Sequence, residues 1–482
     1  MDSPAIPSLD AAALSARLAD GSLGAAELMD ATLARIDAVN PALNAIVSLR
    51  PRAELMAEAE AADLRPSQGW LHGIPFAIKD LADTRGLRTT YGSPSFAGHV
   101  PDADSLMVRR IRAAGAIVIG KTNTPEWGLG SHSYNPVFGV TRNPYDTAKS
   151  AGGSSGGAAA ALAARLVAVA DGSDMMGSLR NPAAFNNVYG FRPTYGRVPS
   201  EPTGDAFLHQ LSVSGPMART PRDLALLLDT LAGPEPTFPH SLPAHRSFTE
   251  DLARPVSGLR IGWLGDWNGF FPMEPGILEL TETALGVFER LGVAVEPIVP
   301  DFDPERLWQA WLTLRHFAVA NELKPLFRAP AERARLKPEA VWEVENGLSL
   351  SADAVHEASV ARTAWNSVLA RLFARFDGLV LPSAQVFPFD AGLHWPSTVG
   401  GRKMDTYHQW MAVVMPVSIV GLPAVALPAG FGSAGLPAGF QLFGRRGEDA
   451  LMLNLAEAYH RMTDWPGRRP PQLPPSNVPR AP

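Results

Sequence analysis

Three segments of the chain carry residue types that could perform chemistry. Lys79 follows the apolar run Pro75–Ile78, so it ends a strand that is expected to be buried. Burial disfavours an ammonium and lowers the pKa of a lysine, which makes Lys79 a candidate base. The alternative, a lysine that snorkels to the surface, is less favoured because only six of the 42 basic residues are lysines.

The other two segments are rich in glycine and carry serines. Gly152-Gly-Ser-Ser-Gly-Gly157 holds two adjacent serines, and Gly172–Pro182 holds Ser178 together with an acid and an arginine. A turn of the second kind can aim consecutive backbone N–H groups at one point. Taken alone, it is also consistent with a structural turn that pairs Asp174 with Arg180.

Two segments match known catalytic or nucleotide-binding motifs, but the residues next to each match argue against that function. Gly115–Thr122 fits the phosphate-loop pattern G-x-x-x-x-G-K-T, but its Ala-Ile-Val-Ile stretch predicts a strand, and Pro125 blocks the helix that should follow. Gly152–Gly156 fits the nucleophile-elbow pattern G-x-S-x-G, which needs a buried strand directly before it. Residues 143–150 are polar and are interpreted as a loop, so an α/β-hydrolase esterase remains a less favoured alternative.

Composition narrows the possible classes. The 482 residues are 46% hydrophobic and 19% charged, as in globular proteins, and there is no cysteine. This excludes disulfide scaffolds, thiol nucleophiles and cysteine-based metal sites. The net charge of −6 argues against nucleic-acid binding. Without a leader-like N-terminus or a bilayer-length apolar run, we expect a cytoplasmic protein with no membrane partner.

Strand and helix patterns alternate along most of the chain, which indicates an α/β fold. We expect a large mixed, mostly parallel twisted sheet with helices on both faces. Residues 1–65 are predicted to form a helical segment that packs on this core, and residues 466–482, with seven prolines, an extended tail. The aromatic residues between 302 and 376 are expected to pack mainly in the core, with a minority lining a pocket.

Three segments in this order resemble the amidase signature family of serine hydrolases: residues 73–80, 152–157 and 172–183. Further family-like stretches are Gly120–Glu126, Asn143–Asp146, Tyr189–Gly196, Gly215–Thr220 and Gly435–Gln441. The likeness extends from about residue 8 to about residue 462 and is weakest from 234 to 400. It implies one α/β domain over residues 66–465, whose 234–400 region determines specificity.

The resemblance implies a Ser–cisSer–Lys triad in which Ser178 is the nucleophile, Ser154 the bridging serine after a cis peptide, and Lys79 the base. A serine hydroxyl becomes nucleophilic when a neighbour removes its proton, and a neutral lysine can do so. Gly152, Gly153 and Ser155 are expected to support the turn around Ser154, while Asp174 and Arg180 brace the nucleophile loop.

The implied oxyanion hole consists of the backbone N–H groups of Met175, Met176, Gly177 and Ser178. One such donor is typically worth about 2.7–4 kcal/mol in the transition state. Position 176 usually holds glycine in this family. The methionine here keeps its N–H, but it restricts the backbone and adds a flexible apolar wall.

The predicted activity is hydrolysis of a small-molecule amide through a Ser178 acyl-enzyme, with side activity on esters or carbamates and with neither a metal nor an organic cofactor. Trp127, Tyr134 and Phe138 are candidates for an apolar or aromatic substrate pocket, and a homodimer is possible. The alternative is a glutamine-dependent tRNA amidotransferase subunit that releases ammonia from glutamine. Such subunits typically carry a threonine-glycine-glycine run before the nucleophile and a glutamine after the arginine, where this chain has Met175–Gly177 and Asn181.

Overall fold

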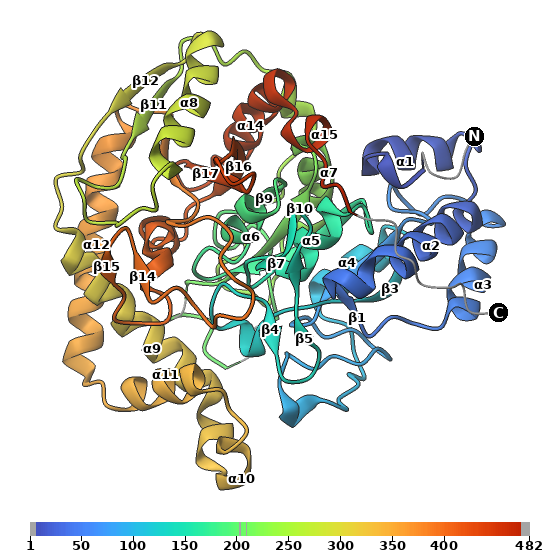
Figure 1. Cartoon of the computed structure of the whole chain (residues 1–482), viewed down its shortest axis with the longest axis horizontal. Coiled ribbons are helices and arrows are strands. Elements are labelled where there is room, and N and C mark those ends of the chain that lie inside the picture. Colours follow the sequence, from blue (N-terminus) through green and yellow to red (C-terminus); the bar gives the residue numbers. More distant parts are fainter. Residues whose placement is uncertain (1–5, 202–203, 209, 474–482) are drawn as a thin grey trace.

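The computed structural model describes residues 6–201, 204–208 and 210–473, and its largest sheet has eight strands (Figure 1). The sheet is parallel from its first to its third strand and antiparallel in every later pairing. In spatial order its strands are β12 (Ala294–Pro297), β11 (Arg260–Trp263), β13 (Gly378–Pro382), β17 (Pro437–Phe443), β16 (Ala424–Phe431), β9 (Tyr189–Arg192), β10 (Val213–Ala218) and β8 (Val169–Asp174).

The predicted large mixed sheet with helices on both faces is confirmed. Its pairing is more antiparallel than the strand–helix alternation led us to expect. The reason is that β10 returns between β8 and β9, which run in the same direction, and that β16 and β17 form a hairpin. Alternation along the chain does not reveal that a later strand is inserted between two earlier ones.

Alternate residues of the central strands point to two different helical layers. Phe191, Val425 and Leu442 belong to an apolar cluster with α7 (Pro221–Leu231), α8 (Ile277–Arg290) and α14 (Asp449–Thr463). The opposite face is covered by α5 (Gly156–Ala163), α6 (Arg180–Phe185), α9 (Pro304–Arg328) and α12 (Ala352–Phe373). Period-two burial on both faces is what a sheet between two layers requires.

A second sheet carries the lysine strand. It has the order β1 (Ile46–Val47), β3 (Ile117–Thr122) and β2 (Pro75–Lys79), with β2 and β3 parallel. The apparent phosphate-loop motif therefore lies in β3, a buried strand, as its apolar residues indicated. The surrounding helices are α1 (Ala11–Ala19), α2 (Ala25–Leu43), α3 (Arg52–Asp63) and α4 (Leu106–Ala113).

The N-terminal helices α2 and α3 share an apolar cluster with α5 and β3. The domain boundaries at 65 and 466 stay predictions. The short helix α15 (Trp465–Arg468) follows α14, and the part of the proline-rich tail from residue 474 onward lies outside the described residues. Across 6–201, 204–208 and 210–473, no helix has both the length and the apolar character needed to cross a membrane.

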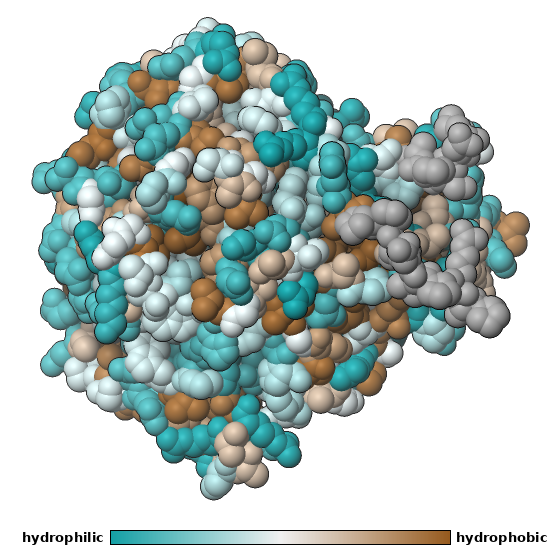
Figure 2. Space-filling view, in the orientation of Figure 1, coloured by the Kyte–Doolittle hydropathy of each residue, from teal (hydrophilic) through white to brown (hydrophobic). Residues whose placement is uncertain are grey.

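The aromatic residues between 302 and 376 mostly pack inside, as expected. Trp311 and Trp365 are completely buried in the cluster formed by α9 and α12. The short helices in the same part of the structure are α10 (Pro330–Arg333), α11 (Pro338–Leu348) and α13 (Met415–Ser418). On the face shown in Figure 2, hydrophilic and hydrophobic side chains are interspersed.

Candidate active site

The side chain of Lys79 lies inside the protein, surrounded by serine hydroxyls. Lys79 is the last residue of β2, and only 1% of its surface is exposed. Its Nζ lies 2.8 Å from Ser154 Oγ, 2.9 Å from Ser155 Oγ and 3.0 Å from Ser173 Oγ. A neutral amine has two N–H groups and one lone pair, so in that state one of these hydroxyls donates to the nitrogen.

Burial lowers the pKa of Lys79 to about 7, although the carboxylates of Asp171 and Asp174 favour its charged form. Asp171 accepts the backbone N–H of Lys79 at 3.0 Å, and burial raises its pKa to about 6. A lysine with a pKa near neutrality holds a substantial neutral fraction at pH 7, which is the state that a general base requires.

Ser154 and Ser155 lie in a tight turn between β7 (Asp146–Ser150) and α5. The peptide bond between Gly153 and Ser154 is cis, as the resemblance implies. Gly152 has a positive φ of 72°, and a Cβ on Gly153 would come within 2.9 Å of the His132 nitrogen, so side chains at both positions are disfavoured.

Residues 143–150, interpreted as a loop from the sequence, instead contain β7, which pairs with β6 (Arg142–Asn143) in an antiparallel hairpin. This part of the prediction is wrong, because the polar residues occupy exposed positions of a short hairpin. A nucleophile elbow needs a buried strand of the central sheet before the serine, and this hairpin does not supply one.

Ser178 lies in the turn between β8 and α6, and the base of this turn is braced by charge. Asp174, at the end of β8, contacts Arg180 Nη2 at 2.9 Å and Arg192 Nη1 at 3.1 Å, and all three side chains are fully buried. Burial opposes the charge on Asp174, but the two guanidiniums outweigh it and hold its pKa well below the usual range. The predicted Asp174–Arg180 pair is thus present, and Arg192 extends it.

The backbone N–H groups of the turn are not equivalent. Gly177 donates to Asp174 Oδ1 at 2.9 Å, so this N–H is already occupied. Gly177 also has a positive φ of 80°, which explains the glycine. Within the part of the chain that the structure describes, the N–H groups of Met175, Met176 and Ser178 have no acceptor. Three of the four expected oxyanion donors are therefore available, and Gly177 serves the turn instead.

The Ser178 side chain is the least constrained of the group. The exposed fraction of Ser178 is 8%, and its hydroxyl makes no hydrogen bond to the described residues. Its backbone carbonyl accepts the N–H of Ser155 at 3.1 Å, which connects the turn that holds Ser178 to the turn that holds Ser154 and Ser155. The two glycine-rich segments that the sequence singled out are therefore in direct contact.

The three aromatic residues expected to line a substrate pocket, Trp127, Tyr134 and Phe138, have different neighbours in the structure. Trp127 stacks on Tyr91 with ring centroids 5.4 Å apart, and Phe138 lies under the Arg88 guanidinium at 5.0 Å. Tyr134 lines a recess of about 10 Å³, large enough for one water molecule at most. Each of the three side chains therefore has its own surroundings, and no ring contact joins any two of them among the described residues.

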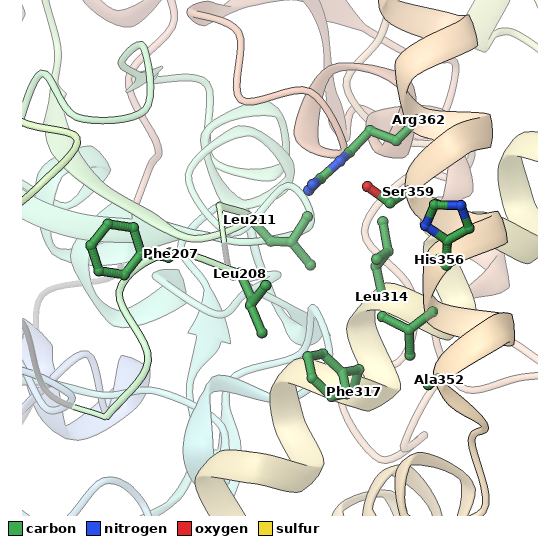
Figure 3. A pocket seen from close by; sticks show the side chains of 10 residues that line it. Phe207, Leu208, Leu211, Leu314, Phe317, Ala352, His356, Ser359 and Arg362 are labelled. Carbon is green, nitrogen blue, oxygen red and sulfur yellow. The ribbon is translucent and has the colours of Figure 1, made fainter.

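A larger cavity of about 330 Å³ opens between α9, α12 and the side chains of Phe207, Leu208 and Leu211 (Figure 3). Leu314 and Phe317 from α9 and Val355 from α12 belong to its apolar lining, and His356, Ser359 and Arg362 from α12 add polar groups. Leu211 and Leu314, which line the cavity, belong to the same apolar cluster as Met176. Phe317 is one of the few residues of the aromatic-rich region that lines a pocket.

Sequence reasoning missed Ser173, Asp171, Arg192 and Arg315. Ser173 was taken as part of a loop, but it lies in β8, whose pairing with β10 holds it against Lys79. Asp171, two residues earlier in the same strand, carried a signal, because an acid inside an apolar strand needs a partner. Arg192 and Arg315 reach the turn from distant elements, and no local pattern marks them.

No metal site is formed by this group. Among residues 6–201, 204–208 and 210–473, no cluster of three histidine, aspartate or glutamate side chains could hold a metal ion. The polar atoms that surround Lys79 are hydroxyls, which are weak ligands for most metals in proteins.

Comparisons with known proteins identify a family for this chain. A family model described as Amidase matches residues 27–453. The chain is 36% identical to a glutamyl-tRNA(Gln) amidotransferase subunit of Chloroflexus aurantiacus, over 96% of this chain and 98% of that protein. It is 34% identical to an acylamidase of Rhodococcus erythropolis, over 96% and 97%. The crystal structure of a bacterial aryl acylamidase of the amidase signature family superposes with a TM-score of 0.89, at 29% identity and over 96% and 99% of the two chains.

The chain therefore belongs to the amidase signature family. Within that family it is an enzyme that hydrolyses amide bonds.

Proposed function

We propose that this enzyme cleaves amides of apolar or aromatic groups through an acyl-enzyme on Ser178, with Lys79 as the base and Ser154 as the proton relay. The observation that carries the proposal is the buried Lys79 amine, which lies 2.8 Å from Ser154 Oγ and has a pKa lowered to about 7 by burial. A base of this kind can take a serine proton at neutral pH.

In the proposed cycle, Ser178 Oγ attacks the amide carbonyl carbon and gives its proton to Ser154, which gives its own proton to Lys79. The contact between Ser178 and Ser154 is not formed in the structure, and catalytic hydrogen bonds often tighten only when substrate is bound. Collapse of the tetrahedral intermediate breaks the C–N bond, and the leaving amine takes the proton back from Lys79 through Ser154. Water, activated in the same way, then hydrolyses the ester on Ser178.

The oxyanion of the intermediate is assigned to the backbone N–H groups of Met175, Met176 and Ser178. These groups have no acceptor among the described residues, so no existing hydrogen bond must break when the oxyanion forms. Preorganised donors of this kind account for a large share of the rate in acyl transfer.

Two features support an apolar substrate. The charged side chains at the nucleophile turn are already paired, since Asp174 binds Arg180 and Arg192. Seven of the ten residues that line the cavity between α9 and α12 are apolar, and we assign this cavity to the acyl or amine group of the substrate. The similarity to acylamidases is consistent with this assignment.

The second candidate is a glutamine-dependent amidotransferase subunit, which the 36% identity to such a protein favours. Two departures weigh against it. Met175 and Met176 stand where a threonine-glycine run is typical, and Asn181 stands where a glutamine is typical. Strict glutaminase activity, or co-purification with partner subunits, would decide for this candidate. The predicted homodimer, the cytoplasmic location and the absence of a cofactor remain predictions.

The test of the proposed activity is to trap the acyl-enzyme by intact-mass spectrometry across a panel of aryl amides, aliphatic amides, esters, carbamates and glutamine. We expect an adduct on Ser178 with aryl or apolar acyl substrates and little with glutamine. An adduct on another residue, or adducts with glutamine alone, would refute the proposal.

The pH dependence of kcat/KM should identify Lys79 as the base. Because the base must be neutral, kcat/KM is expected to fall about tenfold per pH unit below an apparent pKa near 7. The carboxylate of Asp171 favours the lysine ammonium, so Asp171→Asn should lower the pKa of Lys79 and move the acid limb to lower pH. A profile that is flat from pH 5 to 9 would exclude a neutral-lysine base.

Filling the apolar cavity should discriminate between large and small substrates. Val355→Trp places a large ring in the cavity, so kcat/KM for bulky aryl amides is expected to fall about tenfold, while that for acetamide-sized amides changes little. Glu357→Trp adds the same ring on the exposed side of α12 and serves as the control. Equal losses for large and small amides in Val355→Trp would show that the cavity does not hold the substrate.

A further inference from the structure

A buried arginine of the helical region contacts the nucleophile turn. Arg315 lies on α9, and its Nη1 donates to Met175 Sδ at 3.3 Å. Met175 is the first residue after β8 and is one of the residues whose N–H is free to receive an oxyanion. The guanidinium therefore contacts the oxyanion turn from an element 140 residues away in sequence.

Arg315 is itself held rigidly by two other elements. Its Nε donates to Glu343 Oε1 of α11 at 2.6 Å, and its Nη2 donates to Tyr407 OH at 2.6 Å. Tyr407 OH in turn donates to the same Glu343 oxygen at 2.6 Å. The second oxygen of Glu343 lies 2.6 Å from His316 Nδ1. A planar guanidinium that meets three acceptors at once has little freedom to rotate.

The charges in this cluster offset one another. Arg315 is 3% exposed and Glu343 is completely buried, so neither is solvated by water. Burial opposes ionisation of Glu343, but Arg315 and His316 outweigh it and hold the pKa of Glu343 well below its usual range. Because the carboxylate neutralises the guanidinium, the cluster places little net charge next to the oxyanion. Its effect on the turn is therefore geometric.

We propose that Arg315 is a positioning residue, which fixes Met175 through an N–H···S hydrogen bond and so holds the oxyanion donors in register with Ser178. The inference rests on the proposed function, because it assigns the Met175 N–H to the oxyanion. It also links α9 and α11, in the region expected to determine specificity, directly to the catalytic turn.

Met175 is the place to test this link, because its side chain can be changed without emptying the core. Met175→Leu keeps a similar volume and removes the sulfur acceptor, and Met175→Gln restores an acceptor oxygen at a similar distance along the side chain. With a preferred aryl amide, Met175→Leu is expected to lower kcat about tenfold with little change in KM, since the donors are used mainly in the transition state. Met175→Gln should recover most of that loss.

A purely structural role of the cluster predicts a different result. In that case both Met175 variants would keep wild-type kcat and change only the thermal midpoint of unfolding. Wild-type kcat in Met175→Leu would overturn the proposal, and so would an equal loss of kcat in Met175→Gln and Met175→Leu.

A second measurement does not depend on turnover. In a spectrum of the enzyme labelled with ¹³C at the methionine methyl groups, the Met175 signal is identified by its loss in Met175→Leu. Arg315→Lys keeps the charge but cannot reach three acceptors in one plane, so the Met175 methyl signal should shift or broaden. An unchanged signal would refute the contact between Arg315 and Met175. If the signal shifts while no Ser178 adduct forms with any substrate, the contact exists and the proposed function is what fails.

Discussion

Ser178→Ala is expected to lower kcat for amide hydrolysis by roughly 10⁴-fold or more while leaving the fold intact. The hydroxyl of Ser178 makes no hydrogen bond to the described residues, so its removal leaves no buried partner unsatisfied. The backbone contact between Ser178 and Ser155 does not involve the side chain and is retained. Steady-state kinetics, together with circular dichroism and the thermal midpoint, measure both parts of this expectation.

Ser173→Ala provides a matched control for the Ser178 variant. It also removes one serine hydroxyl within the site, 3.0 Å from Lys79 Nζ, but leaves Ser154 and Ser155 in contact with the amine. We expect a loss of no more than about tenfold, the scale of one neutral hydrogen bond. If Ser178→Ala turns over as fast as Ser173→Ala, Ser178 is not the nucleophile.

Several residues singled out from the sequence lie together in the structure. Lys79, Ser154 and the Asp174–Arg180 pair were all marked by local features: an apolar strand that ends in a lysine, a run of glycines around two serines, and an acid six residues before an arginine. The structure brings Lys79 within hydrogen-bond distance of Ser154 and pairs Asp174 with Arg180. Such features can be recognised in a sequence because tight turns and buried strands restrict which residue types can occupy these positions.

Other parts of the site depend on contacts that no local pattern encodes. Gly177 was expected to offer its N–H to the oxyanion, but the carboxylate of Asp174 occupies it. Trp127 and Phe138 were expected in a pocket, but each packs against a different partner. In each case the competing partner is set by the path of the loop, which sequence spacing does not determine.

The same limit applies to the sheet. The strands expected at Pro75–Ile78 and within Gly115–Thr122 appear as β2 and β3, because their apolar residues favour a buried strand. The order in which the strands pair was not predictable. β10 lies between β8 and β9 because long-range packing favours it, and the resulting antiparallel pairs have no signature in the periodicity of any single strand.

Lys79→Met is the second variant with a large expected effect, because it removes the proposed base but keeps the core filled. A general base typically contributes 10²–10⁴-fold, so we expect kcat to fall by roughly 10³-fold. The three hydroxyls around the amine can hydrogen-bond to one another and to the Ser173 carbonyl, which lies within 3.5 Å of Nζ. The variant should therefore fold.

The stability of this variant should depend on pH in a way that identifies the buried amine. The pKa of Lys79 is about 7 when folded and near 10.5 when unfolded, so between these values the unfolded chain binds one more proton than the folded chain. The free energy of unfolding of the wild type is therefore expected to increase as the pH rises from about 7 to about 10.5. At pH 7 and below, where the wild type must keep an ammonium buried or neutralise it, Lys79→Met should be more stable than the wild type by a few kcal/mol. This advantage should disappear toward pH 10.

Lys121→Met separates the loss of the base from the loss of a buried lysine. Lys121 is also completely buried, and burial lowers its pKa to about 8, but its Nζ binds Ala82 O and Thr84 Oγ1 rather than the serines. Its replacement should produce a similar pH-dependent change in stability and keep most of the activity. Denaturant unfolding at pH 6, 8 and 10, combined with kcat for both variants, therefore tests Lys79 specifically. Equal losses of kcat in the two variants would mean that a buried positive charge, and not a base next to Ser154, is what the reaction requires.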